Sequence, residues 1–151
     1  MRVDFYQLTR DPVEAVLPLI ARNTLAQGQR LLVVAEADQF DRLSEALWTR
    51  LPDSFLAHGR AGEPHAERQP ILLSEAIHPA NAARYIALAD GVWREEALTF
   101  DRAFLLFSDT TIVAARAVWR DLGSHDTLDR HLWKQDGGKW LEVASAASTT
   151  Q

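Results

Sequence analysis

The sequence predicts an α/β fold with three layers, a Rossmann-like arrangement in which helices cover both faces of a largely parallel central sheet. Two features carry this prediction. Through the first half of the chain, segments with strand-like apolar patterns alternate with segments in which apolar residues recur at helical spacing. Residues 30–35 contain the uninterrupted run Leu-Leu-Val-Val-Ala, which is typical of a parallel strand buried on both faces. A chain of 151 residues suits one such domain, which we place at residues 1–144, followed by a flexible tail at residues 145–151.

The N-terminal part predicts a strand followed by a helix. Residues 3–8 alternate apolar and polar side chains, which indicates a strand. Asp11 then precedes Pro12, a combination typical of a helix N-cap and a proline in the first helical position. Apolar residues recur at helical spacing from Val13 onwards, and Gly28 can end this helix.

The rest of the chain continues the alternation. A second helix is expected at residues 38–50, and a short strand at residues 56–57. Apolar runs bounded by turn residues predict three further strands, at residues 71–74, 84–89 and 100–107. Residues 109–122 again have helical spacing, and residues 131–143 predict a small hairpin that turns around residues 136–138.

The composition excludes several classes of function. The net charge of −5 disfavours a surface that binds DNA phosphates throughout. The absence of cysteine excludes disulfides, thiolate metal sites and a cysteine nucleophile. No run of about 18 apolar residues predicts a membrane span, and the acidic residues near the N-terminus are unlike a signal peptide. We therefore expect a cytoplasmic protein that has no contact with a membrane.

Nucleotide binding is common in folds of this type, but the loop that would bind the phosphates is missing. Neither G-x-x-x-x-G-K-[ST] nor G-x-G-x-x-G occurs. After the first strand the chain continues Thr9-Arg10-Asp11-Pro12, in which the proline removes one amide donor and the aspartate repels a phosphate. We therefore expect no nucleotide cofactor.

His58, Glu63 and His65 are the candidates for a metal site. Imidazole and carboxylate groups suit zinc, but the spacing of these residues matches no compact zinc motif. A solvent-exposed loop of ordinary polar residues is the alternative. No serine lies in G-x-S-x-G. We predict no metal, no catalytic residue and no enzymatic activity; a metal- or nucleotide-dependent hydrolase on the same fold is the competing hypothesis.

The helix at residues 109–122 carries the candidate functional residues Arg116, Trp119 and Arg120. The two arginines are one turn apart, and such a pair of like charges costs roughly 0.2–0.5 kcal/mol in an isolated helix. An anion held between them would offset that cost, because guanidinium groups grip carboxylates bidentately. Trp119 could add apolar contact for a peptide that ends in an apolar residue. Alternatively, Trp119 belongs to the core and Asp109 or Asp121 balances two solvated arginines.

Two motifs in this order resemble the chi subunit of bacterial DNA polymerase III. The first motif of that family is approximately L-x-x-A-L-W, a short turn, S-F-x-P-H and a G-E loop. The residues that match it are Leu43, Ala46, Leu47, Trp48, Ser54, Phe55, His58, Gly62 and Glu63. Ala57 stands where the family usually has proline. The second motif is similar to R-E-R-[WY]-K, and Arg116, Trp119 and Arg120 match it, while Ala117 and Val118 replace its charged middle pair.

The resemblance implies an adaptor without catalytic activity. Chi proteins join the clamp-loader complex to the single-stranded-DNA-binding protein, whose acidic C-terminal tail ends in Phe with a free carboxylate. By this resemblance, Arg116 and Arg120 bind carboxylates of the tail and Trp119 forms part of its apolar pocket. Phe107, just before the helix, is a candidate for the pocket wall.

Trp48 and Phe55 have two alternative roles. They are core aromatics that anchor the turn, or they shape the surface beside the tail pocket. The resemblance also implies a small psi-like partner in the clamp loader, bound through a face separate from the tail site, and contact with DNA only indirectly through these partners. The competing hypothesis from another class is a module that binds single-stranded nucleic acid directly, which the acidic composition disfavours.

Overall fold

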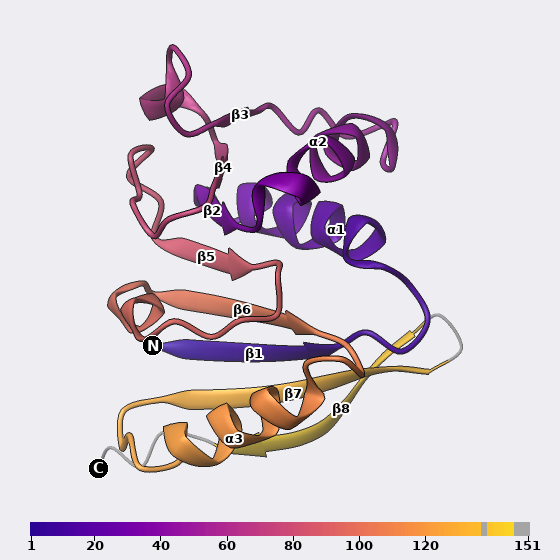
Figure 1. The fold of residues 1–151 in the computed structure, drawn as a ribbon, viewed down its shortest axis with the longest axis vertical. Coiled ribbons are helices and arrows are strands. Elements are labelled where there is room, and N and C mark those ends of the chain that lie inside the picture. Colours follow the sequence, from indigo (N-terminus) through magenta and orange to yellow (C-terminus); the bar gives the residue numbers. More distant parts are fainter. Residues whose placement is uncertain (137–138, 147–151) are drawn as a thin grey trace.

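The fold is a single eight-stranded sheet with helices on both faces (Figure 1). The computed structural model describes residues 1–136 and 139–146. The strands follow the order β3-β4-β2-β5-β6-β1-β7-β8, and every neighbouring pair is parallel except β7 and β8. Their bounds are β1 Arg2–Gln7, β2 Leu31–Val34, β3 His58–Arg60, β4 Ile71–Ser74, β5 Tyr85–Leu88, β6 Arg102–Phe107, β7 Asp129–Asp136 and β8 Lys139–Ala146.

Three α-helices within the described residues make the two outer layers. Helices α1 (Val13–Ala26) and α2 (Phe40–Thr49) pack on one face of the sheet, and α3 (Ile112–Leu122) packs on the other. Strand β2 shows how the two faces of the sheet are covered. Leu31 and Val33 face α1 and α2, whereas Leu32 and Val34 face the α3 side. Short 3-10 helices lie in the connections, at Ala37–Gln39, Ala66–Arg68 and Glu95–Thr99. The predicted three-layer α/β fold with a largely parallel sheet is confirmed.

A buried carboxylate ties three neighbouring strands together. Asp4 of β1 has no exposed surface. It accepts hydrogen bonds from Arg2 Nε at 3.1 Å, from Arg102 Nε of β6 at 2.8 Å and from Trp133 Nε1 of β7 at 3.0 Å. A buried charge is tolerated only when it is paired and hydrogen-bonded in this way. The network fixes β7 beside β1, and this position matters for the site described below.

The start of α1 differs from the prediction. Pro12, not Asp11, occupies the N-cap position, and no side chain caps the helix. Asp11 instead turns toward β7, where its Oδ2 accepts a hydrogen bond from Gln135 Nε2 at 3.0 Å. The prediction was wrong because the partner that holds Asp11 lies far away along the chain.

Two further elements differ in extent. The short strand begins at His58 rather than at residue 56, because Leu56 is buried in the core and the strand pairs at the sheet edge with β4 only. The C-terminal hairpin is longer than predicted, with β7 joined to the sheet in parallel beside β1. Strand β8 continues to Ala146, two residues past the predicted start of the tail; residues 137–138 of the predicted turn and residues 147–151 lie outside the described residues.

Candidate partner-binding site

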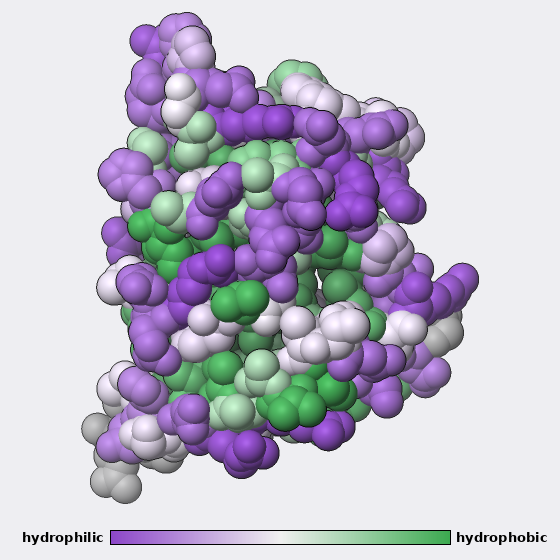
Figure 2. Space-filling model, viewed as in Figure 1, coloured by the Kyte–Doolittle hydropathy of each residue, from purple (hydrophilic) through white to green (hydrophobic). Residues whose placement is uncertain are grey.

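A cavity of about 230 Å³ lies between α3 and the adjacent strands β1, β6 and β7. Its apolar lining is Phe5, Phe107, Ile112, Ala115 and Leu132, and its other lining residues are Gln7, Arg116, Trp119 and Arg120. Figure 2 shows apolar atoms gathered over α3, with hydrophilic side chains around them. The structure therefore brings together four of the six residues predicted for tail binding, which are Phe107, Arg116, Trp119 and Arg120.

Trp119 is held as a wall of this cavity. Its ring contacts Phe5 edge-on, with 5.1 Å between the ring centroids. The guanidinium of Arg130 lies 4.5 Å from the Trp119 ring centroid, and Arg130 Nη1 donates a hydrogen bond to the Trp119 carbonyl. A cation over an indole face is an attractive contact. Trp119 is therefore anchored on two sides while it still lines the cavity.

Arg116 and Arg120 are exposed at the rim of the cavity. Among residues 1–136 and 139–146, neither guanidinium has an ion pair or a hydrogen bond with a side chain. The balancing partners that the sequence allowed, Asp109 and Asp121, do not pair with them. Two unpaired guanidiniums one helical turn apart, beside an apolar cavity, form a local site for an anion that carries an apolar group.

Trp48 and Phe55 lie elsewhere. Trp48 is 49% exposed and Phe55 is 80% exposed, so they are not core aromatics. Their ring centroids are 5.9 Å apart, at the end of α2. Helix α2 covers the opposite face of the sheet from α3, near the β3 edge, whereas α3 lies at the β7–β8 end (Figure 1). Trp48 and Phe55 therefore do not border the α3 cavity, where the other four predicted residues lie. They form a second surface, which we call the α2 aromatic surface (Trp48 and Phe55).

The candidate metal residues do not form a ligand set. Both nitrogens of His58 are hydrogen-bonded, Nε2 with Ser44 Oγ at 2.7 Å and Nδ1 with the Leu56 carbonyl at 2.9 Å. Burial lowers the pKa of His58 below its ordinary value, an effect that the hydrogen bond to Leu56 opposes and that Arg60 reinforces. Within the described part of the chain, no group of three His, Cys, Asp or Glu residues could hold a metal ion.

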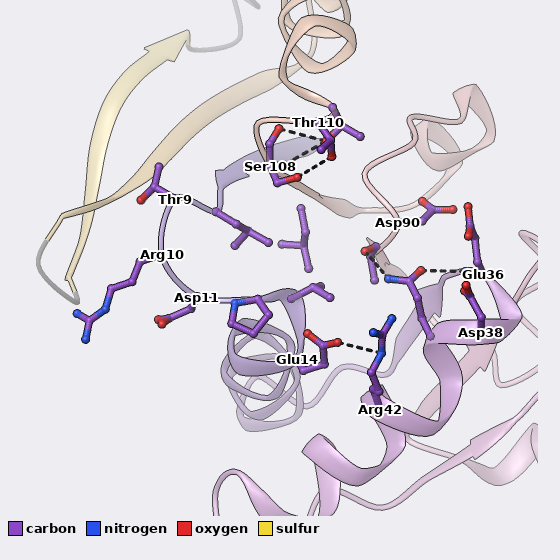
Figure 3. A pocket seen from close by; sticks show the side chains of 17 residues that line it. Thr9, Arg10, Asp11, Glu14, Glu36, Asp38, Arg42, Asp90, Ser108 and Thr110 are labelled. Atoms are coloured by element: carbon purple, nitrogen blue, oxygen red, sulfur yellow. Dashed lines mark hydrogen bonds and ion pairs between the residues drawn. The ribbon is translucent and has the colours of Figure 1, made fainter.

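A second and larger cavity, about 600 Å³, lies at the carboxyl ends of β1, β2, β5 and β6 (Figure 3). This is where folds of this type bind nucleotides. The backbone N–H groups of Thr9, Arg10 and Asp11, which would face a phosphate, all donate to Gln135 Oε1, each at 3.2 Å. A side-chain oxygen of β7 thus takes the place of a phosphate oxygen.

Carboxylates dominate the rest of this larger cavity. Glu14, Glu36, Asp38 and Asp90 line it, and Glu14 pairs with Arg42 at 3.3 Å (Figure 3). Negative charge at this position repels phosphates. The arrangement gives the nucleotide-dependent alternative no support.

Sequence reasoning missed three residues that shape the two cavities. Phe5 and Leu132 line the α3 cavity from β1 and β7, which are neighbours only because of the strand order. Gln135 closes the phosphate position from the same strand. Their apolar or amide character carries no local signal, and only knowledge that β7 lies beside β1 could have found them.

Comparison with known families gives one match. The sequence model described as DNA polymerase III chi subunit, HolC, matches residues 1–127. The matched part contains α2, α3 and six of the eight strands, and it ends before β7 and β8. No curated protein matches the chain. None of the helices in the described residues combines the length and apolar character needed to cross a membrane.

Proposed function

This chain belongs to the family of the DNA polymerase III chi subunit, and we propose that it is an adaptor in the cytoplasm that links the clamp loader to single-stranded-DNA-binding protein. The family is one of accessory, non-catalytic replication subunits. In the proposal, the α3 cavity takes the acidic C-terminal tail of single-stranded-DNA-binding protein, and the α2 aromatic surface takes a psi-like subunit. Contact with DNA is indirect, through these partners.

The observation that carries the tail-binding proposal is that Arg116 and Arg120 lie at the rim of an apolar cavity and that neither has an ion pair or a side-chain hydrogen bond among the described residues. A chain that ends in Phe presents an aromatic ring and a carboxylate on the same residue. The ring suits the lining of Phe5, Phe107 and Leu132, and the carboxylate suits the guanidiniums. Acidic residues before the terminus would meet the second arginine.

The affinity of this site for the tail should be modest and sensitive to salt. Both guanidiniums are exposed, and exposed ion pairs contribute roughly 0–1 kcal/mol each because water and salt screen them. The apolar contact of one terminal Phe adds roughly 1.5–3 kcal/mol when its side chain is fully buried. An adaptor that must release its partner during replication works with such an affinity.

The test of the tail site is a titration of a labelled acidic peptide that ends in Pro-Phe. The free acid should bind in the micromolar range, and amidation of its C-terminus should abolish binding, because the amide removes the charge that pairs with the arginines. Arg116→Ala should weaken binding by up to about fivefold, which corresponds to about 1 kcal/mol, without a change in the unfolding transition.

Arg22→Ala is the matched control, because Arg22 is also an exposed helical arginine but lies on α1, on the other face of the sheet. Equal binding of the acid and the amide, or an Arg116→Ala variant that binds the tail as tightly as the Arg22→Ala control, would remove the assignment of this cavity. Bare single-stranded DNA belongs in the same titration series. Binding to it that falls steeply with salt would favour the direct nucleic-acid-binding alternative.

We propose the α2 aromatic surface as the site of the psi-like partner because of its exposure and its position. Large aromatic side chains that protrude from a soluble protein mark interaction sites, and tryptophan is enriched among residues that dominate binding energy. Trp48 and Phe55 lie on the opposite face from the tail cavity, so both partners fit on one chain at the same time. Binding of a purified psi-like subunit to Trp48→Ala with unchanged affinity would refute this placement.

A further inference from the structure

His58 belongs to the first sequence motif, yet neither a metal site nor the tail cavity uses it. Its imidazole lies directly against Trp48, with 4.5 Å between the ring centroids and an interplanar angle of 43°. Its two nitrogens bond to Ser44 and to the carbonyl of Leu56. The ring is therefore fixed in position by two hydrogen bonds and one aromatic contact.

The two hydrogen bonds reach the two segments that carry the exposed aromatics. Ser44 lies on α2, one helical turn before Trp48, and Leu56 directly follows Phe55. One imidazole thus connects the helix that presents Trp48 to the loop that presents Phe55. The Leu56 carbonyl can only accept, so Nδ1 carries the proton and donates, and Nε2 of the neutral ring accepts from the Ser44 hydroxyl.

We infer that His58 is a positioning residue for partner docking: it fixes Trp48 and Phe55 relative to each other as a preorganised aromatic surface. Exposed aromatic side chains otherwise lose rotamer freedom when a partner binds, and that loss reduces affinity. The imidazole occupies the space beside the Trp48 ring, and this contact limits the positions that the ring can adopt. This inference rests on the proposed function, in which the α2 aromatic surface binds a psi-like subunit.

The test compares variants that remove the imidazole, one of its bonds or the docking ring itself. His58→Ala removes the support of the Trp48 ring and both hydrogen bonds, and it should weaken binding of the purified psi-like subunit on the order of tenfold. Ser44→Ala keeps the imidazole and loses only one bond, and it should weaken binding by about threefold. Both variants should bind the Pro-Phe tail peptide as wild type does, because that cavity lies on the other face of the sheet.

A spectroscopic readout separates positioning from a general loss of structure. The chain has five tryptophans, and fluorine NMR of protein labelled with 5-fluorotryptophan resolves them, with Trp48→Phe to assign the resonance of Trp48. In His58→Ala the Trp48 resonance should shift and its solvent isotope effect should change, while the other tryptophan resonances stay in place. A general loss of structure would move all of them.

The outcomes distinguish this inference from the proposed function. If Trp48→Ala abolishes subunit binding while His58→Ala and Ser44→Ala bind normally with an unmoved Trp48 resonance, the positioning role is refuted and the docking surface stands. If Trp48→Ala binds normally, the docking surface is refuted and the positioning role for docking falls with it. If His58→Ala does not fold, Ser44→Ala makes the same comparison with the imidazole still in place.

Discussion

The α3 cavity and the α2 aromatic surface lie on opposite faces of one sheet and differ in shape and polarity. The α3 cavity is concave and apolar inside, and its two rim arginines have no partner within the described residues. The α2 aromatic surface protrudes, and the polar groups beneath it are already bonded to each other through His58. The first suits a flexible chain end with a charge, and the second suits a preformed apolar face. The difference predicts that the two partners respond differently to mutation, salt and pH.

The largest expected effect is that two variants each lose affinity for a different partner. Trp48→Ala should reduce the affinity for the psi-like subunit by roughly 2 kcal/mol or more, because a protruding tryptophan at an interface is typically a dominant contact. The combined variant Arg116→Ala, Arg120→Ala should instead weaken tail binding by up to about 2 kcal/mol and leave subunit binding unchanged. Isothermal titration calorimetry of each variant with both partners measures these affinities. A variant that loses both partners at once, with an intact unfolding transition, would show that the two sites are not independent.

The next effect concerns a residue beyond the family match. Leu132 of β7 lines the α3 cavity, although the match ends at residue 127. Leu132→Ala should weaken tail binding by about 1 kcal/mol, because part of the apolar lining is lost. Subunit binding at the α2 aromatic surface should not change. Leu141→Ala, an exposed apolar position on β8 that does not line the cavity, is the control. Equal tail affinity of Leu132→Ala and this control would exclude β7 from the site.

The comparison also shows which parts of the fold were predictable. Strand β2 was predictable because burial on both faces requires a continuous apolar run. Strand β3 was misplaced because three partly exposed residues at a sheet edge carry no such pattern. Asp11 was assigned to the wrong role because its partner, Gln135, lies 124 positions away. Periodicity describes what a segment buries, but it contains no information on which distant side chain completes a loop.

The residues of the candidate site also separate into those that local spacing predicts and those that depend on the strand order. Arg116, Trp119 and Arg120 were predicted together because one helix sets their spacing, and Phe107 because the preceding strand ends beside that helix. Phe5 was missed, since its place in the cavity depends on the strand order β6-β1-β7. The two motifs lie on opposite faces because the connection through α2 runs from β2 toward the β3 edge, whereas the connection through α3 runs from β6 in the opposite direction to β7. Right-handed crossovers that run in opposite directions along a sheet place their helices on opposite faces. The order of motifs along the chain says nothing about that separation.

Salt should separate the two surfaces with a smaller effect. Raising the ionic strength from about 0.1 M to about 1 M shortens the Debye length from ~10 Å to ~3 Å. Tail binding should weaken several-fold, because it depends on exposed charge pairs at Arg116 and Arg120. Subunit binding at Trp48 and Phe55 should change by less than about twofold, because apolar burial is not screened. Equal salt dependence of both partners would contradict the division into a site that depends on exposed charge pairs and a site that depends on apolar contacts.

The smallest expected effect is a pH dependence of stability that arises at the α2 aromatic surface. Burial lowers the pKa of the His58 imidazole below its ordinary value of 6.5, so the unfolded chain binds this proton more tightly than the folded protein does. Well above pH 6.5 the ring is neutral in both states and its full contribution to stability is present. As the pH falls below that value, the unfolded state takes up the proton first, and the free energy of unfolding decreases until the lowered pKa is passed.

Urea unfolding of wild type and His58→Gln between about pH 7.5 and pH 4.5 measures this dependence. Glutamine does not titrate, so the difference between the two proteins isolates the imidazole from the carboxylates that also titrate at low pH. Wild type should lose more stability than His58→Gln over this range. Parallel pH profiles would show that the His58 proton is bound equally in both states. The hydrogen bonds to Ser44 and Leu56 would then hold the charged ring as readily as the neutral one, and the α2 aromatic surface would be as well ordered in mild acid as at neutral pH.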